Sequence, residues 1–129
     1  KIQTLLEKGL REEAARIPQE QTMSFEYIYS KDVGRALDLA ATVRLPAKTV
    51  FNIGTGQVLT FDDLTSAARR VLPNLKVEII PGRPPHLSVT QPMDCSRAKE
   101  FLSWEPQFTM DQAFEDYIQE LKRDRGVGH

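Results

Sequence analysis

Apolar residues along this chain follow two spacings, one typical of helices and one typical of strands. Apolar side chains three or four positions apart predict helices at residues 2–15, 31–45, 61–72, 96–102 and 110–121. Short runs of aromatic and β-branched residues predict strands at 25–29, 49–53 and 76–80. Because helices and strands alternate, the pattern predicts an α/β fold, in which a small mixed or partly parallel sheet is covered by helices.

Polar residues at the ends of these segments support the predicted boundaries. Ser30 can cap the second helix, which places Asp32 in the first helical turn. Thr60 and Asp63 have the spacing of a capping box, in which each side chain bonds a free backbone N–H of the other residue. Residues 81–92 contain four prolines and one glycine, which exclude regular structure. A loop of this length in a compact domain is often functional.

The length and composition are those of one globular domain without a nucleic-acid or membrane partner. The chain has 129 residues, of which 40% are hydrophobic and 27% charged, and its formal net charge is -1. Lysines and arginines are spread among carboxylates, so no basic face is predicted. No apolar stretch has the length of a membrane span. We expect a single lobe over residues 1–125 and a disordered tail at 126–129.

Residues with distinctive chemistry are few, and most have a structural interpretation. Cys95 is the only cysteine, so no intramolecular disulfide is expected, and a reducing, cytoplasmic location fits best. Its thiol has no histidine at a recognisable position to act as a base, which favours a buried or half-buried structural cysteine. His86 and His129 are too few for a metal site. Trp104 lies between two short helices and is expected in the core.

Two pairs of residues have the spacing of known motifs but lack the other features that those motifs require. Tyr27 and Lys31 have a Tyr-x-x-x-Lys spacing, which supports proton transfer only when both side chains share a helix face and the ammonium lowers the pKa of the phenol. Here Tyr27 lies in a predicted strand and Lys31 beyond a helix cap. Gly54 and Gly56 begin like a dinucleotide-binding turn, but Leu59 replaces the third glycine. We therefore expect no catalytic residue and no bound nicotinamide cofactor in this chain.

Arg83 is the strongest candidate for contact with a ligand. It lies in the irregular loop between Gly82 and Pro84, where its guanidinium can present a planar fork of donors to a phosphate. An ordinary surface arginine is the alternative, of about equal weight on composition alone. The sequence thus predicts residues 81–92 as the first place to look for a binding site.

Four segments occur in a fixed order along the chain: Tyr27–Val33, Val50–Gly56, Asp94–Lys99 and Trp104–Pro106. Together with the predicted helix near the start, this ordered set resembles the C-terminal substrate-binding lobe of the extended short-chain dehydrogenase/reductase family, the NAD-dependent epimerases and dehydratases. No single motif is specific, but the resemblance covers nearly the whole chain. It implies the C-terminal lobe of such an enzyme without its Rossmann domain. A first residue other than methionine also suggests a fragment or a processed chain.

The resemblance implies a parent enzyme, an NAD(P)-dependent epimerase, dehydratase or reductase acting on a sugar nucleotide or a related small molecule. NAD or NADP and the catalytic residues would belong to the missing N-terminal Rossmann domain. The fragment alone would then bind no cofactor and be inactive, and the parent could be a homodimer. Arg83 would contact the diphosphate, and His86 in the same loop is the second expected substrate-binding residue.

Two departures from the family pattern leave the function open. Phe25 stands where many sugar-nucleotide enzymes have an arginine, and Pro85 and His86 replace the acid that commonly follows the loop arginine. Each charged hydrogen bond contributes about 1.5–3 kcal/mol, so the substrate could differ from a standard UDP-sugar. One alternative is a non-catalytic binding or assembly module on a degenerate scaffold of this family. Another is an independently folded interaction domain.

Overall fold

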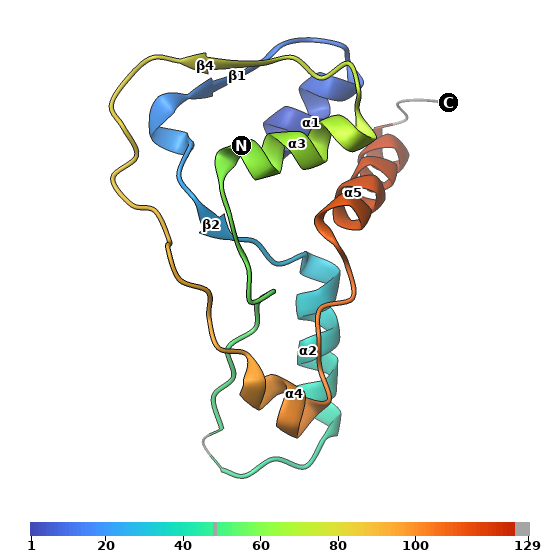
Figure 1. Cartoon of the computed structure of the whole chain (residues 1–129). Coiled ribbons are helices and arrows are strands. Elements are labelled where there is room, and N and C mark those ends of the chain that lie inside the picture. Colours follow the sequence, from blue (N-terminus) through green and yellow to red (C-terminus); the bar gives the residue numbers. More distant parts are fainter. Residues whose placement is uncertain (48, 126–129) are drawn as a thin grey trace.

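The computed structural model describes residues 1–47 and 49–125, which form an elongated α/β structure (Figure 1). The elements in chain order are α1 (Ile2–Leu10), β1 (Ala15–Pro18), the 3-10 helix η1 (Gln19–Gln21), β2 (Phe25–Glu26), α2 (Ser30–Thr42), β3 (Val58–Leu59), α3 (Phe61–Val71), β4 (Val77–Ile80), α4 (Ser96–Leu102) and α5 (Met110–Arg125). β1 pairs with β4 in parallel, and β2 pairs with β3 in antiparallel. None of the described helices is long and apolar enough to cross a membrane. The predicted disordered tail, 126–129, lies outside the described residues.

The larger hydrophobic core lies between α1, α3, α5 and the strand pair of β1 and β4. The predicted capping box starts α3: Asp63 N–H donates to Thr60 Oγ1 at 3.1 Å, and Thr60 N–H donates to the Asp63 carboxylate at 2.9 Å. The large buried side chains of this core are Leu5, Leu6, Ile17, Phe61, Leu64, Leu75, Phe114, Ile118 and Leu121. Complete burial of one such side chain contributes about 1.5–3 kcal/mol, so this core contributes strongly to the stability of the molecule.

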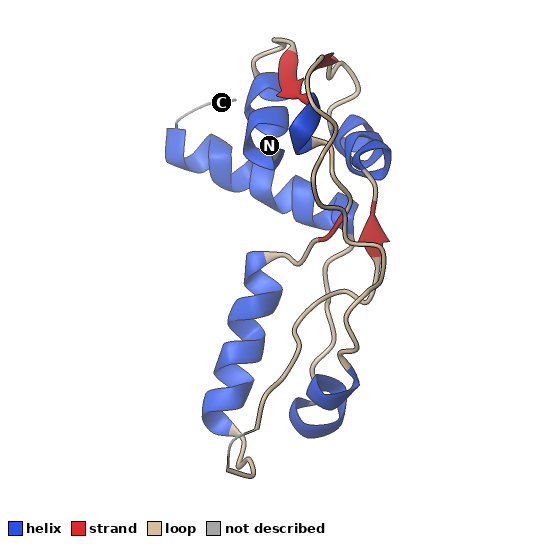
Figure 2. Cartoon of the chain, turned by 90° about the vertical axis from the view of Figure 1, so that its left-hand side faces the viewer, coloured by secondary structure: helices blue, strands red, loops and turns tan. Residues whose placement is uncertain are grey.

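A second, smaller core lies between α2 and α4. Its buried residues are Ala36, Ala98, Leu102 and Trp104. Trp104 is 1% exposed, which confirms its predicted place in a core. Figure 2 shows α2 and α4 together in the lower half of the molecule, apart from the helices of the larger core. The chain therefore has two packed ends, joined by the segments around β2 and β3.

Asp32 forms hydrogen bonds that connect the segment between α4 and α5 to the start of α2. It lies in the first turn of α2, as predicted, and is 1% exposed. Its carboxylate accepts the N–H of Gln107 at 2.9 Å and the N–H of Phe108 at 3.2 Å. Ser30 is the first residue of this helix and not its cap; Tyr29 takes the N-cap position without a side-chain hydrogen bond. The helix start is thus stabilised by tertiary contacts, where the sequence predicted a local cap.

The predicted helix at 2–15 is too long. The helix ends at Leu10, and Glu12 then turns the chain with a left-handed φ of 55°. Ala15 and Ile17 are buried on alternate positions of β1, which is the period of a strand. Pairing with β4 therefore overrides the helix preference of the alanines in this stretch.

The predicted strands at 25–29 and 49–53 also differ from the structure. Only Phe25–Glu26 of the first is a strand, and none of the second is. Phe51 and Ile53 pack against the second core without a backbone partner strand among the described residues. The prediction of one small sheet is also wrong. The described part of the chain holds two separate two-stranded sheets.

Candidate functional site

The proline-rich segment, residues 81–93, follows β4 and runs along the edge of the molecule toward α4 (Figure 1). It contains neither helix nor strand, as the prolines predicted. Arg83 and His86, the two predicted substrate-binding residues, lie on this segment and are both exposed. Their side chains can therefore be reached by a ligand from solvent.

Hydrogen bonds hold the proline-rich segment against the chain that leads into β2. Near its start, Gly82 N–H donates to the Gln19 side-chain oxygen at 3.0 Å. Further along, Val89 N–H donates to the backbone oxygen of Ser24 at 2.9 Å. Prolines supply no N–H, so each bond from the remaining residues matters for the path of such a segment. The segment thus has a defined course although it is irregular.

Glu26 lies where the proline-rich segment meets the turn at 54–56. Its Oε1 accepts Met93 N–H at 2.8 Å, and its Oε2 accepts Gly56 N–H at 3.2 Å. Gly56 has a φ of 72°, a conformation that favours glycine. The nearby Cys95 thiol is half-buried, as predicted, and burial followed by the charge of Glu26 raises its pKa. A thiol with a raised pKa is a poor nucleophile, which agrees with a structural role.

A mainly apolar pocket of about 990 Å³ lies elsewhere, between the start of α1, the connection from β2 to α2, and α5. Aromatic and aliphatic side chains from these elements line it, among them Ile2, Phe25, Tyr27, Phe108, Phe114 and Tyr117. Neither Arg83 nor His86 lines this pocket. The structure therefore does not bring the predicted site residues together with the apolar pocket.

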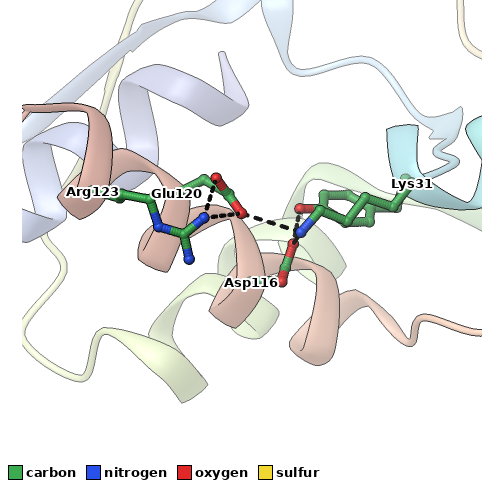
Figure 3. Close-up of polar contacts among 5 residues, drawn as sticks. Lys31, Asp116, Glu120 and Arg123 are labelled. Atoms are coloured by element: carbon green, nitrogen blue, oxygen red, sulfur yellow. Dashed lines mark hydrogen bonds and ion pairs between the residues drawn. The ribbon is translucent and has the colours of Figure 1, made fainter.

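A polar network lies at one rim of the pocket, between the start of α2 and α5 (Figure 3). Lys31 Nζ pairs with Asp116 at 2.6 Å and with Glu120 at 3.2 Å, and Arg123 also pairs with Glu120 at 3.2 Å. The Tyr29 hydroxyl donates to Asp116 Oδ2 at 2.5 Å. Hydrogen bonds from Lys31 and then from Tyr29 lower the pKa of Asp116. Burial, and then the bond to Asp116, raises the pKa of Tyr29, which keeps its hydroxyl a donor.

An Asp116→Asn substitution is expected to lower the free energy of unfolding by less than about 1 kcal/mol near neutral pH, because the ion pair is partly exposed. The folded-state pKa of Asp116 is lowered. Its contribution is therefore full above the unfolded value of about 3.9 and is lost as the pH falls through the folded-state pKa. Urea unfolding at about pH 6 and about pH 3 measures the difference from the wild type, which should shrink at the lower pH.

The exposed Asp124 on the same helix provides the control for this prediction. Asp124→Asn should change the free energy of unfolding by less than about 0.5 kcal/mol at both pH values, as expected of an exposed surface position. A wild-type advantage over Asp116→Asn that is the same at both pH values would show that the advantage does not come from the ionised carboxylate.

Tyr27 and Lys31 do not share a helix face. Tyr27 precedes α2, its hydroxyl is buried without a hydrogen-bond partner among the described residues, and burial raises its pKa. Lys31 is paired with the acidic side chains of α5. Within 1–47 and 49–125, no group of His, Cys, Asp and Glu side chains could hold a metal ion. His129 lies outside the described residues.

Solved structures of sugar-nucleotide enzymes match this fold. MoeE5 in complex with UDP-glucuronic acid and NAD is 25% identical and has a TM-score of 0.79; the match covers 95% of this chain and 41% of that one. UDP-glucose 4-epimerase with UDP-glucose from Thermotoga maritima is 27% identical with a TM-score of 0.79, covering 96% and 40%. The dTDP-glucose 4,6-dehydratase from Bacillus anthracis, in complex with NAD, shares the fold at 16% identity, a TM-score of 0.74, and coverage of 97% and 39%.

The chain thus spans about 40% of the length of these structures, while nearly all of its own length is matched. No protein-family model matches the sequence. No curated protein matches it either.

Proposed function

We propose that this chain, which over about 95% of its length is built like part of an extended short-chain dehydrogenase/reductase of the epimerase and dehydratase group, is the C-terminal substrate-binding lobe of such an enzyme. The structural match to two enzymes solved with UDP-sugars, at 25% and 27% identity, carries the proposal. The choice of lobe is supported by the sequence, in which Leu59 replaces the third glycine of a dinucleotide turn, and by Tyr27 and Lys31, which do not share a helix.

In this proposal the chain recognises the substrate and does not transform it. Arg83 holds an anionic group, the diphosphate of a sugar nucleotide, because a guanidinium can donate two parallel hydrogen bonds to phosphate oxygens. His86 lies three residues further along the same exposed segment and adds a second contact. NAD or NADP would supply hydride transfer in the parent enzyme. The residues that bind the nicotinamide and move protons would lie on polypeptide outside this chain.

The binding test compares the wild type with Arg83→Ala. UDP and UDP-glucose are titrated into the ¹⁵N-labelled chain, and amide chemical shifts give the binding site and Kd. We expect shifts concentrated on the proline-rich segment. Arg83→Ala should weaken binding roughly 10- to 150-fold, the equivalent of about 1.5–3 kcal/mol for charged hydrogen bonds. Arg44→Ala, an exposed arginine after α2, is the matched control and should bind like the wild type.

Two outcomes would count against the proposal. If neither UDP nor UDP-glucose shifts any resonance at millimolar concentration, the substrate-binding assignment fails, and a non-catalytic binding or assembly module is favoured. If the ligand binds but Arg83→Ala leaves Kd unchanged, Arg83 is not the anion contact. Shifts around the apolar pocket would then locate the ligand there.

A further inference from the structure

The Glu26 carboxylate occupies the space that a side chain at position 54 would fill. Its two oxygens accept the backbone N–H groups of Met93 and Gly56, so both are used. A β-carbon added at Gly54 would lie 2.0 Å from Glu26 Oε2 and 2.9 Å from the methyl group of Met93. Both distances are shorter than carbon and oxygen atoms tolerate without moving apart. Only a residue without a side chain at position 54 leaves the carboxylate in this place.

This contact is one of several that hold the proline-rich segment. The others, at Gly82, Ser88 and Val89, join uncharged groups. A hydrogen bond to a carboxylate is roughly twice as strong as one between neutral groups, so Glu26 makes the strongest of these contacts. Arg83 directly follows the contact at Gly82. The course of the backbone that carries Arg83 is therefore set by this row of contacts.

We propose that Glu26 is a positioning residue: its carboxylate joins the proline-rich segment to the turn at 54–56 and thereby fixes the geometry in which Arg83 is presented. The effect on ligand binding rests on the proposed function, whereas the effect on the segment itself does not. Each oxygen of Glu26 accepts one backbone N–H, from Met93 and from Gly56, so the carboxylate acts on Arg83 only through the backbone.

Removing the Glu26 carboxylate has two possible effects on the binding of an anion, one from its charge and one from its positioning role, and they have opposite signs. A carboxylate on the edge that receives a diphosphate repels it, so removing the charge alone would tighten binding. Removing the support of the segment would instead loosen the Arg83 geometry and weaken binding. The direction of the change in Kd therefore separates the two roles.

The first part of the test needs no ligand. Amide spectra and amide exchange rates are compared for wild type, Glu26→Ala and Glu26→Gln. We expect Glu26→Ala to shift the resonances of Met93 and Gly56, and also those of Val89 and Gly82, and to speed exchange at Val89 by roughly tenfold or more. Glu26→Gln keeps one acceptor oxygen and should give intermediate changes.

A control variant and an opposite outcome make this part decisive. Glu100→Ala, at an exposed position of α4, should leave all four resonances unchanged. If Glu26→Ala alters only Met93 and Gly56, the contact is local and the proposal is wrong. Unchanged α3 resonances check that the variant is folded. If Glu26→Ala does not fold, Glu26→Gln carries the comparison, with the same four resonances expected to shift.

The second part measures the affinity for UDP. Glu26→Ala is expected to weaken UDP binding by about fivefold or more, with Glu26→Gln between it and the wild type. Unchanged or tighter binding would overturn the positioning role of Glu26. If UDP fails to bind the wild type, the proposed function fails instead, and the amide comparison alone decides whether Glu26 positions the segment.

Discussion

A Trp104→Ala variant is expected to lose about 3–5 kcal/mol of unfolding free energy, the usual cost of truncating a buried aromatic residue. Trp104 is 1% exposed and packs with Ala98 and Leu102 at the centre of the second core. Two further contacts disappear with it. Its indole N–H donates to the backbone oxygen of Asp32 at 2.9 Å, and the Arg35 guanidinium lies 5.8 Å from the ring centre. Urea unfolding followed by circular dichroism gives the difference.

Two further variants separate packing from hydrogen bonding. Trp104→Phe keeps an aromatic ring but removes the indole N–H and its bond to the Asp32 backbone oxygen, and should cost about 1–3 kcal/mol for the lost hydrogen bond and the smaller ring. Phe101→Ala, on the short helix α4 that precedes Trp104 but 39% exposed, should cost less than either Trp104 variant. A loss below about 1 kcal/mol for Trp104→Ala would mean that the second core contributes little to the stability of the molecule.

The helices could be predicted because their signals are local. For example, the capping box of Thr60 and Asp63 forms its two hydrogen bonds within four residues of the chain, and both bonds are present in the structure. The apolar residues at helical spacing from Met110 onward likewise predict α5. Periodicity and capping act over one or two helical turns, so one sequence contains enough information to place such elements.

The strands could not be predicted as well, because a strand needs a partner that is distant in sequence. Ala15–Pro18 is a strand because it pairs with Val77–Ile80, about sixty residues away. Val50 to Ile53 has aromatic and β-branched residues but no partner strand within the described part of the chain. Strand preference in a sequence describes side chains that suit a pleated surface, and it does not supply that surface.

The surroundings of Arg83 could be predicted only in part, because the proline-rich segment also contacts residues that are distant in sequence. The prolines around Arg83 indicated an irregular, exposed segment, and the structure has one. The role of Glu26 was missed, because its partners lie 30 and 67 residues away. Gly54 was a usable signal: a β-carbon at this position would meet Glu26, whereas Gly56 is explained by its positive φ alone.

An Asp32→Ala variant is expected to lose about 2–4 kcal/mol of unfolding free energy. The substitution removes the acceptor for the N–H groups of Gln107 and Phe108, and each partly buried N–H left without a partner costs about 1–3 kcal/mol. It also removes the 3.6 Å ion pair with Arg35 and a negative charge at the start of α2, where the helix dipole favours one. Urea unfolding measures the loss.

The remaining variants show how much of that loss comes from the hydrogen bonds. Asp32→Asn keeps one acceptor oxygen for the two N–H groups and should lose less than Asp32→Ala. Asp38→Ala, on an exposed position of the same helix, should stay within about 0.5 kcal/mol of the wild type. If Asp32→Ala were as stable as Asp38→Ala, the turn between α4 and α5 would not depend on this carboxylate. Its burial beside Trp104 would then need another explanation.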